Sequence, residues 1–154
     1  MSTYFPDTSA LIKRYIAEKG HSWIRSLYAT NPKPILVISQ ITLTECVTTI
    51  CRKAREQSIS INERDAIIDV FLRHRQRLYQ MVPVTNAICI EAGTLCKTHR
   101  LRAYDAIQLA SVLTYRKLSL TDQRTVPIFI SADNQLLAVA SSEGLATENP
   151  NNYE

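Results

Sequence analysis

The sequence lacks the features that mark membrane, secreted and zinc-binding proteins. Its longest aliphatic run, Ile35–Ile38, is far shorter than the roughly 20 apolar residues that a membrane-spanning helix requires. The amino terminus has no basic segment followed by an apolar stretch, so no signal peptide is expected. Four cysteines occur, none in a C-x-x-C pair, and packing as small apolar residues explains them better than zinc or a disulfide. We therefore expect a cytoplasmic protein with no membrane association.

Glycine and proline are also scarce, with 3 and 6 residues, and no repeat or low-complexity segment is visible. The chain has 154 residues, 45% of them hydrophobic, which is enough for one domain with an apolar core. We expect that domain to cover residues 1–148, followed by a polar tail at 149–154. The net charge of +4 weakly favours an anionic partner, although many basic proteins bind no nucleic acid.

Strand-like and helix-like apolar patterns alternate along the chain. Ile35–Ile38 and Pro127–Ser131 are short aliphatic runs of the kind found in strands buried on both faces of a parallel sheet. Weaker strands are expected at residues 3–5, 82–84 and 145–146. Helices are expected near residues 9–18, 23–28, 42–57, 62–78, 86–99, 104–117 and 134–142, with Asn62 capping the fourth. This alternation predicts a three-layer α/β/α sandwich around a short, mostly parallel sheet.

Four acidic residues stand where an α/β fold commonly binds ligands, just beyond the carboxyl ends of strands. Asp7 and Asp133 directly follow expected strands, Glu45 lies one turn into a helix, and Asp105 begins another. Taken singly, each has an ordinary structural explanation. Asp7 suits a helix cap, Asp105 interacts favourably with a helix dipole, Glu45 suits a solvated helix face, and Asp133 suits a turn.

The four acids are more informative as a set. Carboxylates held close together repel one another, so a cluster of them normally requires a cation. Oxygen ligands without histidine or cysteine at ligand spacing favour Mg²⁺ or Mn²⁺ over zinc. His21, His74 and His99 are scattered, and we interpret them as surface or core residues. The spacing alone does not establish the strand order that would bring the acids together.

Four segments, in order, resemble the motifs of the PIN-domain family. DTSALIK at residues 7–13 resembles the opening motif, and ITLTE at 41–45 resembles the second, in which a helix presents a glutamate. LRAYDAIQLA at 101–110 is similar to the third and most specific motif, and FISADNQLL at 129–137 is similar to the fourth. Gly144-Leu145 and Asn149-Pro150 match the usual ending. The similarity covers nearly the whole chain and is weakest between about Ser58 and Tyr79.

The resemblance implies a metal-dependent endoribonuclease, of the kind found as the toxin of a VapBC toxin–antitoxin pair. Carried over position by position, it assigns the acidic, metal-holding site to Asp7, Glu45, Asp105 and Asp133, with Mg²⁺ or Mn²⁺ as the cofactor. Ser9 matches the family's hydroxyl beside the first acid. The resemblance further implies an RNA substrate, a homodimer, and a cognate antitoxin whose carboxy-terminal peptide places a basic side chain among the carboxylates.

Three clusters of basic residues are expected to contact the RNA backbone, foremost Arg100 and Arg102 beside Asp105. The other two are Arg52, Lys53 and Arg55 on the helix of Glu45, and Arg73, Arg75 and Arg77 on the next helix. A solvated charged face is the alternative explanation for each. Two other folds that gather acids around magnesium fit less well. A receiver domain requires adjacent acids after the first strand, and a phosphatase with a D-x-D motif requires an acid where Ser9 stands. The remaining alternative is a PIN module that binds RNA or regulates a partner without cleaving RNA.

Overall fold

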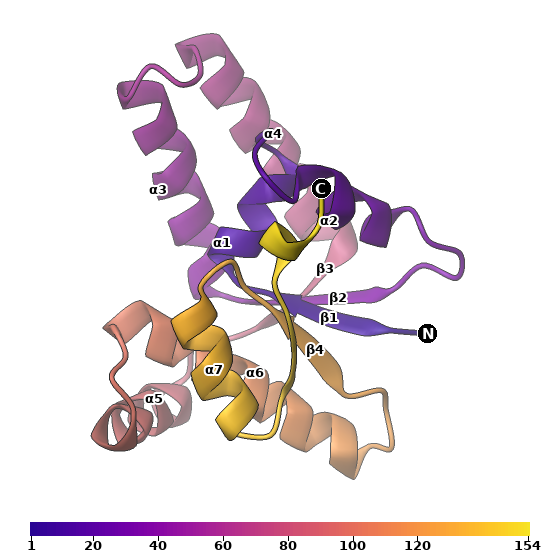
Figure 1. Cartoon of the computed structure of the whole chain (residues 1–154), viewed down its shortest axis with the longest axis vertical. Helices are drawn as coiled ribbons and strands as arrows, with labels where there is room; N and C mark the ends of the chain where they lie inside the picture. Colours follow the sequence, from indigo (N-terminus) through magenta and orange to yellow (C-terminus); the bar gives the residue numbers. More distant parts are fainter.

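The computed structural model describes all 154 residues, which form a five-stranded sheet with helices on both faces (Figure 1). The strands are β1 (Thr3–Pro6), β2 (Ile35–Ser39), β3 (Tyr79–Val82), β4 (Pro127–Ile130) and β5 (Ala146–Glu148). They lie in the order β3-β2-β1-β4-β5, and every neighbouring pair is parallel. The predicted α/β/α sandwich is confirmed, and its sheet is entirely rather than mostly parallel.

Helices α1 to α4 cover one face of the sheet, and α5 to α7 cover the other (Figure 1). Their bounds are α1 (Thr8–Leu11), α2 (His21–Tyr28), α3 (Ile41–Arg55), α4 (Ile61–Leu78), α5 (Asn86–Thr98), α6 (Ala103–Thr121) and α7 (Asn134–Ser142), with short 3-10 helices η1 (Ile12–Arg14) and η2 (Pro150–Asn152). None of these helices is both long and apolar enough to span a bilayer. The larger apolar core lies under α5 to α7, where Phe5, Phe129 and Leu109 are fully buried.

Several expected boundaries were wrong, and each has a local cause. The helix expected over 9–18 stops near Arg14, because the Lys13 carbonyl pairs with the His21 ring (2.6 Å) instead of with a further helical turn. Helix α4 is capped by Ser60, not Asn62, through a capping box with Glu63. Strand β3 ends just before Pro83, which has no N–H to donate to a neighbouring strand.

The cysteines only partly follow the expected packing. All four are free thiols, so no disulfide joins them. Cys46 lies on the buried face of α3, as a small apolar residue would, and Cys51 on the same helix is half-buried. Cys89 and Cys96 are exposed on α5, because the buried face of that helix consists of Ile88, Ala92 and Leu95.

Residues 149–154, expected as a polar tail, pack onto the start of α2. Asn149 and Pro150 are buried, and the Tyr153 ring stacks on Trp23 with 4.3 Å between ring centroids. Gly20, which precedes α2, has φ +83°, and a Cβ there would lie 2.4 Å from the Pro150 carbonyl oxygen. The chain end therefore fixes the loop that precedes α2, and a glycine is required at the point of contact.

Candidate acidic site

The strand order brings the two acids that follow strands to one edge of the sheet. Strand β1 lies at the centre, paired with β4 on one side and β2 on the other. Asp7 follows β1, and its N–H donates to the Ile130 carbonyl at the end of β4 (2.9 Å). Asp133 lies three residues beyond that carbonyl, so the two acids leave the sheet side by side.

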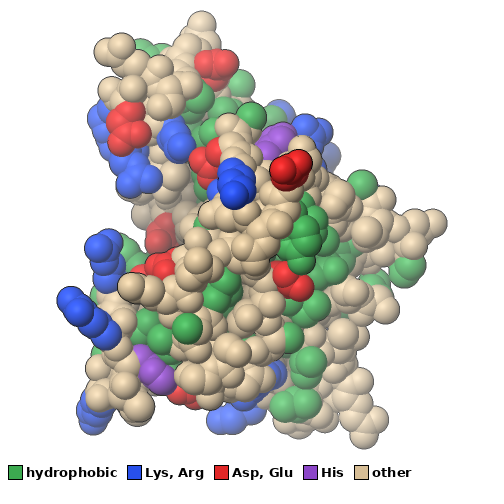
Figure 2. Space-filling view, in the orientation of Figure 1, with side chains coloured by type: hydrophobic (Ala, Val, Ile, Leu, Met, Phe, Trp, Pro, Cys, Tyr) green, Lys and Arg blue, Asp and Glu red, His purple; other side chains and the backbone are tan.

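All four predicted acids line one cavity of about 450 Å³. Glu45 reaches it from α3, which follows β2, and Asp105 reaches it from the first turn of α6. Figure 2 shows acidic side chains in the hollow on the left of the molecule, with lysine and arginine side chains above and below it. The structure thus brings together the four acids that spacing alone did not place.

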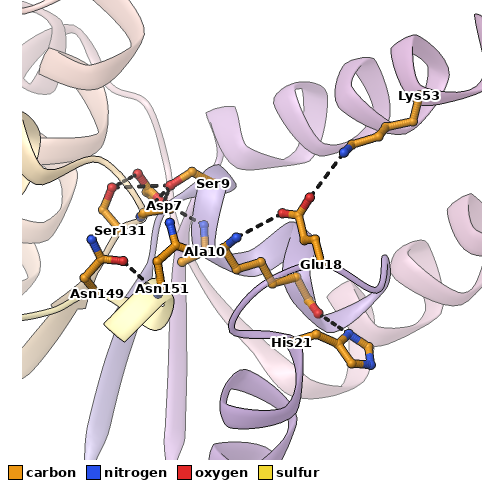
Figure 3. A network of polar contacts seen from close by, with 11 residues as sticks. Asp7, Ser9, Ala10, Glu18, His21, Lys53, Ser131, Asn149 and Asn151 are labelled. Atoms are coloured by element: carbon orange, nitrogen blue, oxygen red, sulfur yellow. Dashed lines mark hydrogen bonds and ion pairs between the residues drawn. The ribbon is translucent and has the colours of Figure 1, made fainter. Parts of the chain in front are cut away.

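Asp7 is held by three hydrogen bonds, seen at the left of Figure 3. One carboxylate oxygen accepts from Ser9 Oγ (2.7 Å) and from the Ala10 N–H (2.9 Å), and the other accepts from Ser131 Oγ (2.6 Å). Asp7 is only 5% exposed. Burial, with a smaller contribution from the charge of Asp105, raises its pKa to about 6 against the effect of these hydrogen bonds. Asp7 also caps α1, so the ordinary explanation and the site coexist.

Glu45 is oriented by neighbours that sequence reasoning missed. Its Oε1 accepts from Thr8 Oγ1 (2.9 Å) and from Gln108 Nε2 (2.9 Å). Gln108 is buried, also donates to Thr42 (2.8 Å), and has an Oε1 without a partner. The available signal was spacing, since Gln108 stands three residues after Asp105 and so lies on the same face of α6.

Asp105 and Asp133 are held less tightly. The Asp105 carboxylate makes no hydrogen bond within the chain. Burial raises its pKa most, the charges of Asp133 and Glu45 raise it further, and the charge of Arg102 opposes that rise. Asp133 caps α7, with its Oδ1 accepting from the N–H groups of Gln135 (2.8 Å) and Leu136 (3.2 Å). The second oxygen of Asp133 has no partner in the chain, so both residues keep carboxylate oxygens for a ligand.

The donor set suits a hard divalent cation in its chemistry. Of the five carboxylates that line the cavity, only Glu18 forms ion pairs, with Lys13 and Lys53, and the four predicted acids form none with a lysine or arginine. As the side chains stand, however, no three Asp, Glu, His or Cys residues are close enough to hold one ion. A cation here would require side-chain rotation or bridging waters, and Mg²⁺ commonly keeps several of its waters in proteins.

The predicted RNA-contacting arginines are only partly gathered at the cavity. Arg52 and Arg102 line it, whereas Arg100 is exposed in the loop before α6 and does not. The cavity also includes Lys53, which was expected to contact the RNA backbone, and Lys13 and Glu18, which sequence reasoning did not single out. No histidine lines it, which agrees with the interpretation of His21, His74 and His99 as surface or core residues.

Comparison with known proteins identifies the fold family. Residues 4–142 match the family model described as PIN domain. The chain belongs to the PIN domain family. The family membership expected from the four motifs is therefore confirmed. No curated protein sequence matches the chain.

Solved structures with this PIN fold include bacterial toxins. VapC20 of Mycobacterium tuberculosis, described as a sarcin–ricin loop cleaving toxin, is 18% identical with a TM-score of 0.63, over 94% of this chain and 97% of that one. VapBC2 of Rickettsia felis, bound to a promoter DNA fragment, is 13% identical with a TM-score of 0.59, over 96% of this chain and 98% of that one. VapBC-1 of nontypeable Haemophilus influenzae is 16% identical with a TM-score of 0.58, over the same shares of the two chains. Similarity at these identities demonstrates a shared fold.

Proposed function

We propose that this PIN domain is a metal-dependent endoribonuclease that hydrolyses RNA phosphodiester bonds. The observation that carries the proposal is the convergence of Asp7, Glu45, Asp105 and Asp133, from four different elements, on one cavity without a cationic partner. A cluster of carboxylates is costly unless it binds a cation. The fold shared with VapC20, described as a sarcin–ricin loop cleaving toxin, supports the choice of RNA as substrate.

The chain's own residues divide the work at this site. Ser9 and Ser131 fix the Asp7 carboxylate, and Thr8 and Gln108 fix one oxygen of Glu45. Bound Mg²⁺ or Mn²⁺ would lower the pKa of a water molecule and stabilise charge on the phosphate oxygens. Because the carboxylate oxygens of Asp7 and Glu45 are already fixed, they need little reorganisation when substrate binds.

Asp105 completes the acidic site, since it has no hydrogen bond to hold it and can move toward its neighbours. Arg102, Arg52 and Arg100 contact backbone phosphates, with Arg102 beside Asp105 at the start of α6. Attack by water leaves 5′-phosphate and 3′-hydroxyl ends. A 2′,3′-cyclic product is not expected, because no histidine lines the cavity.

The biological setting we propose is a type II toxin–antitoxin system, with this chain as the toxin. Structures of the same fold are described as VapBC complexes and as a toxin–antitoxin complex from Klebsiella pneumoniae. A cognate antitoxin would place a basic side chain among the four carboxylates and neutralise them. In this proposal the protein acts in the cytoplasm as a homodimer.

One observation favours a second candidate, a PIN module that binds RNA without cleaving it. No three acids are close enough to hold an ion as the side chains stand. This candidate and the nuclease differ in a single measurable property, metal-dependent cleavage.

The deciding experiment incubates purified protein with a panel of structured RNAs in Mg²⁺, Mn²⁺ or EDTA. We expect cleavage with either metal, none with EDTA, and a loss of at least ~100-fold in Asp105→Asn. Asp69→Asn, at an exposed position on α4 outside the cavity, serves as the matched control and should cleave like wild type. Cleavage that persists in Asp105→Asn, or RNA binding without cleavage, would contradict the nuclease proposal.

A further inference from the structure

A buried lysine shares the cavity with the four acids but is not paired with any of them. Lys13, in η1, is 5% exposed, and its Nζ lies 3.1 Å from Glu18 Oε1. Lys53, on α3, lies 3.2 Å from the other oxygen of Glu18. Figure 3 shows Glu18 reaching from the loop before α2 toward Lys53. Buried lysines are rare unless they are paired, so Glu18 is what allows Lys13 to stand here.

The position of Glu18 is itself fixed by its loop. The His21 ring pairs with the Lys13 carbonyl (2.6 Å), which closes residues 13–21 into a compact turn. Gly20, at the end of that turn, is pressed against Pro150 of η2. The two ammonium groups are therefore held in place before any ligand arrives, and preorganised groups lose little entropy when they bind.

The two lysines keep donors for a further partner. Each ammonium group carries three N–H donors, and Glu18 is the only hydrogen-bond acceptor that either one meets. Two lysines and one glutamate leave this group with a net charge of +1. The cavity thus contains an acidic centre and, separately, a cationic one.

The two centres are separated along one wall of the cavity. Glu45 and Lys53 stand eight residues apart on α3, which corresponds to ~12 Å at the helical rise. Thr49 and Arg52, which also line the cavity, lie between them on the same helix. A ligand that meets both centres must carry phosphate groups separated by about that distance. A strand of several nucleotides satisfies this requirement, and a mononucleotide does not.

We propose that Lys13 and Lys53, held by Glu18, form a phosphate-binding subsite for the RNA backbone, distinct from the phosphate that is cleaved at the acids. The inference rests on the proposed ribonuclease function for the identity of the ligand. It assigns Lys13 of η1 and Lys53 of α3 to substrate positioning. It also explains why Lys13 pairs with Glu18 and leaves the four acids free.

The test measures binding of a short fluorescein-labelled single-stranded RNA in EDTA, by anisotropy at a series of salt concentrations. Lys53→Met is the main variant, because Lys53 is 25% exposed in its side chain and tolerates substitution better than buried Lys13. We expect ~10-fold weaker binding and a slope of log K against log salt reduced by about 0.7, the value for one lost phosphate contact on a single strand. Lys53→Arg should retain the wild-type slope.

Lys117→Met is the matched control, since Lys117 is exposed on α6, lies outside the cavity and forms no ion pair. It changes the net charge equally and should bind RNA like wild type. A purely structural ion pair predicts that Lys53→Met lowers the melting temperature while affinity and salt slope stay unchanged, and this result would overturn the subsite.

The binding readout does not depend on cleavage, so the subsite and the nuclease can fail separately. If the wild type cleaves RNA, Lys53→Met should raise KM and leave kcat nearly unaltered. If the wild type cleaves nothing but Lys53→Met still shows the weaker binding and the lower slope, the proposed nuclease fails and the subsite stands.

Discussion

Two adjacent cations leave the same 3-10 turn and end in opposite surroundings. Lys13 enters the acidic cavity and pairs with Glu18, while the four predicted acids there have no cationic partner. Arg14 enters a cluster of tyrosines on the other side of the turn, donates to Tyr79 Oη (2.8 Å) and lies 3.9 Å over the Tyr28 ring. Arg14 and the hydroxyls of Tyr15 and Tyr79 have hydrogen-bond partners within the chain, whereas the Asp105 carboxylate of the first region has none.

The tyrosine cluster shows how the fold stabilises buried polar groups when no ligand is involved. The Tyr15 hydroxyl pairs with the Tyr79 hydroxyl (2.6 Å) and with His74 Nδ1 (3.1 Å). Burial raises the pKa of Tyr15, Tyr28 and Tyr79, so all three phenols are neutral at physiological pH. A single cation among neutral acceptors and aromatic faces is favourable. Four carboxylates around one cavity repel one another, which favours the proposal that they bind a cation, although Asp7 and Asp133 also cap helices.

The largest expected effect comes from Asp7→Asn, which should change activity and stability in opposite directions. We expect cleavage to fall at least ~100-fold. The metal-free protein should nevertheless gain about 1–2 kcal/mol at pH 7, because the raised pKa of about 6 means that the folded state carries the Asp7 charge at a cost. Urea unfolding in EDTA, beside cleavage assays in Mg²⁺, measures both quantities.

The pH dependence of that gain follows from the direction of the shift. The folded state binds a proton below about pH 6 and the unfolded state only below about pH 4, so the cost of the charge disappears as the pH falls through this window. The stability difference between Asp7→Asn and wild type should therefore vanish by about pH 4. A variant less stable than wild type at pH 7 would show that Ser9, Ser131 and Ala10 fully compensate the buried charge, and the contrast between the two regions would be lost.

A smaller effect is expected from Gln108→Met, which removes the buried donor that orients Glu45. Cleavage should fall about tenfold, and the Mg²⁺ concentration for half-maximal activity should rise, since groups that orient metal ligands typically contribute 10–100-fold to affinity. Stability should change by less than ~1 kcal/mol, because the substitution also removes the unpartnered Oε1. A structural role alone would lower the melting temperature and leave the metal titration unaltered.

The division between what the sequence predicts and what the structure adds follows the same contrast. The sheet strands and the four acids could be predicted from the sequence, because buried strands are continuous apolar runs and each acid lies inside a motif. The groups that orient the acids were not, because Gln108, Thr8 and Ser131 act across distances of up to 124 residues in the chain. Only the strand order β2-β1-β4 brings those segments together.

The same limit applies to Lys13, Glu18 and the chain end. In sequence, Lys13 is one more basic residue beside Arg14, and residues 149–154 look like solvent-exposed polar chain. Their roles depend on a loop that is fixed by the contact between Gly20 and Pro150, which are 130 residues apart in the sequence. No periodicity or local propensity encodes that contact, so the helix expected over 9–18 was drawn too long.

The smallest expected effect is in the tyrosine cluster, where Tyr79→Phe should lower stability and leave catalysis unaltered. Losing the hydroxyl removes hydrogen bonds to Arg14 and Tyr15, at a cost of about 1–2 kcal/mol and a melting temperature lower by about 3–6 °C. Tyr4→Phe is the matched control, because the half-buried Tyr4 hydroxyl has no hydrogen-bond partner and its removal should cost little. Cleavage below the unfolding transition should match wild type in both variants, since neither residue lines the acidic cavity. If Tyr79→Phe also slows cleavage at a temperature where the variant is folded, the turn that carries Lys13 and Arg14 couples the two regions. The tyrosine cluster would then help to hold the acidic site in place.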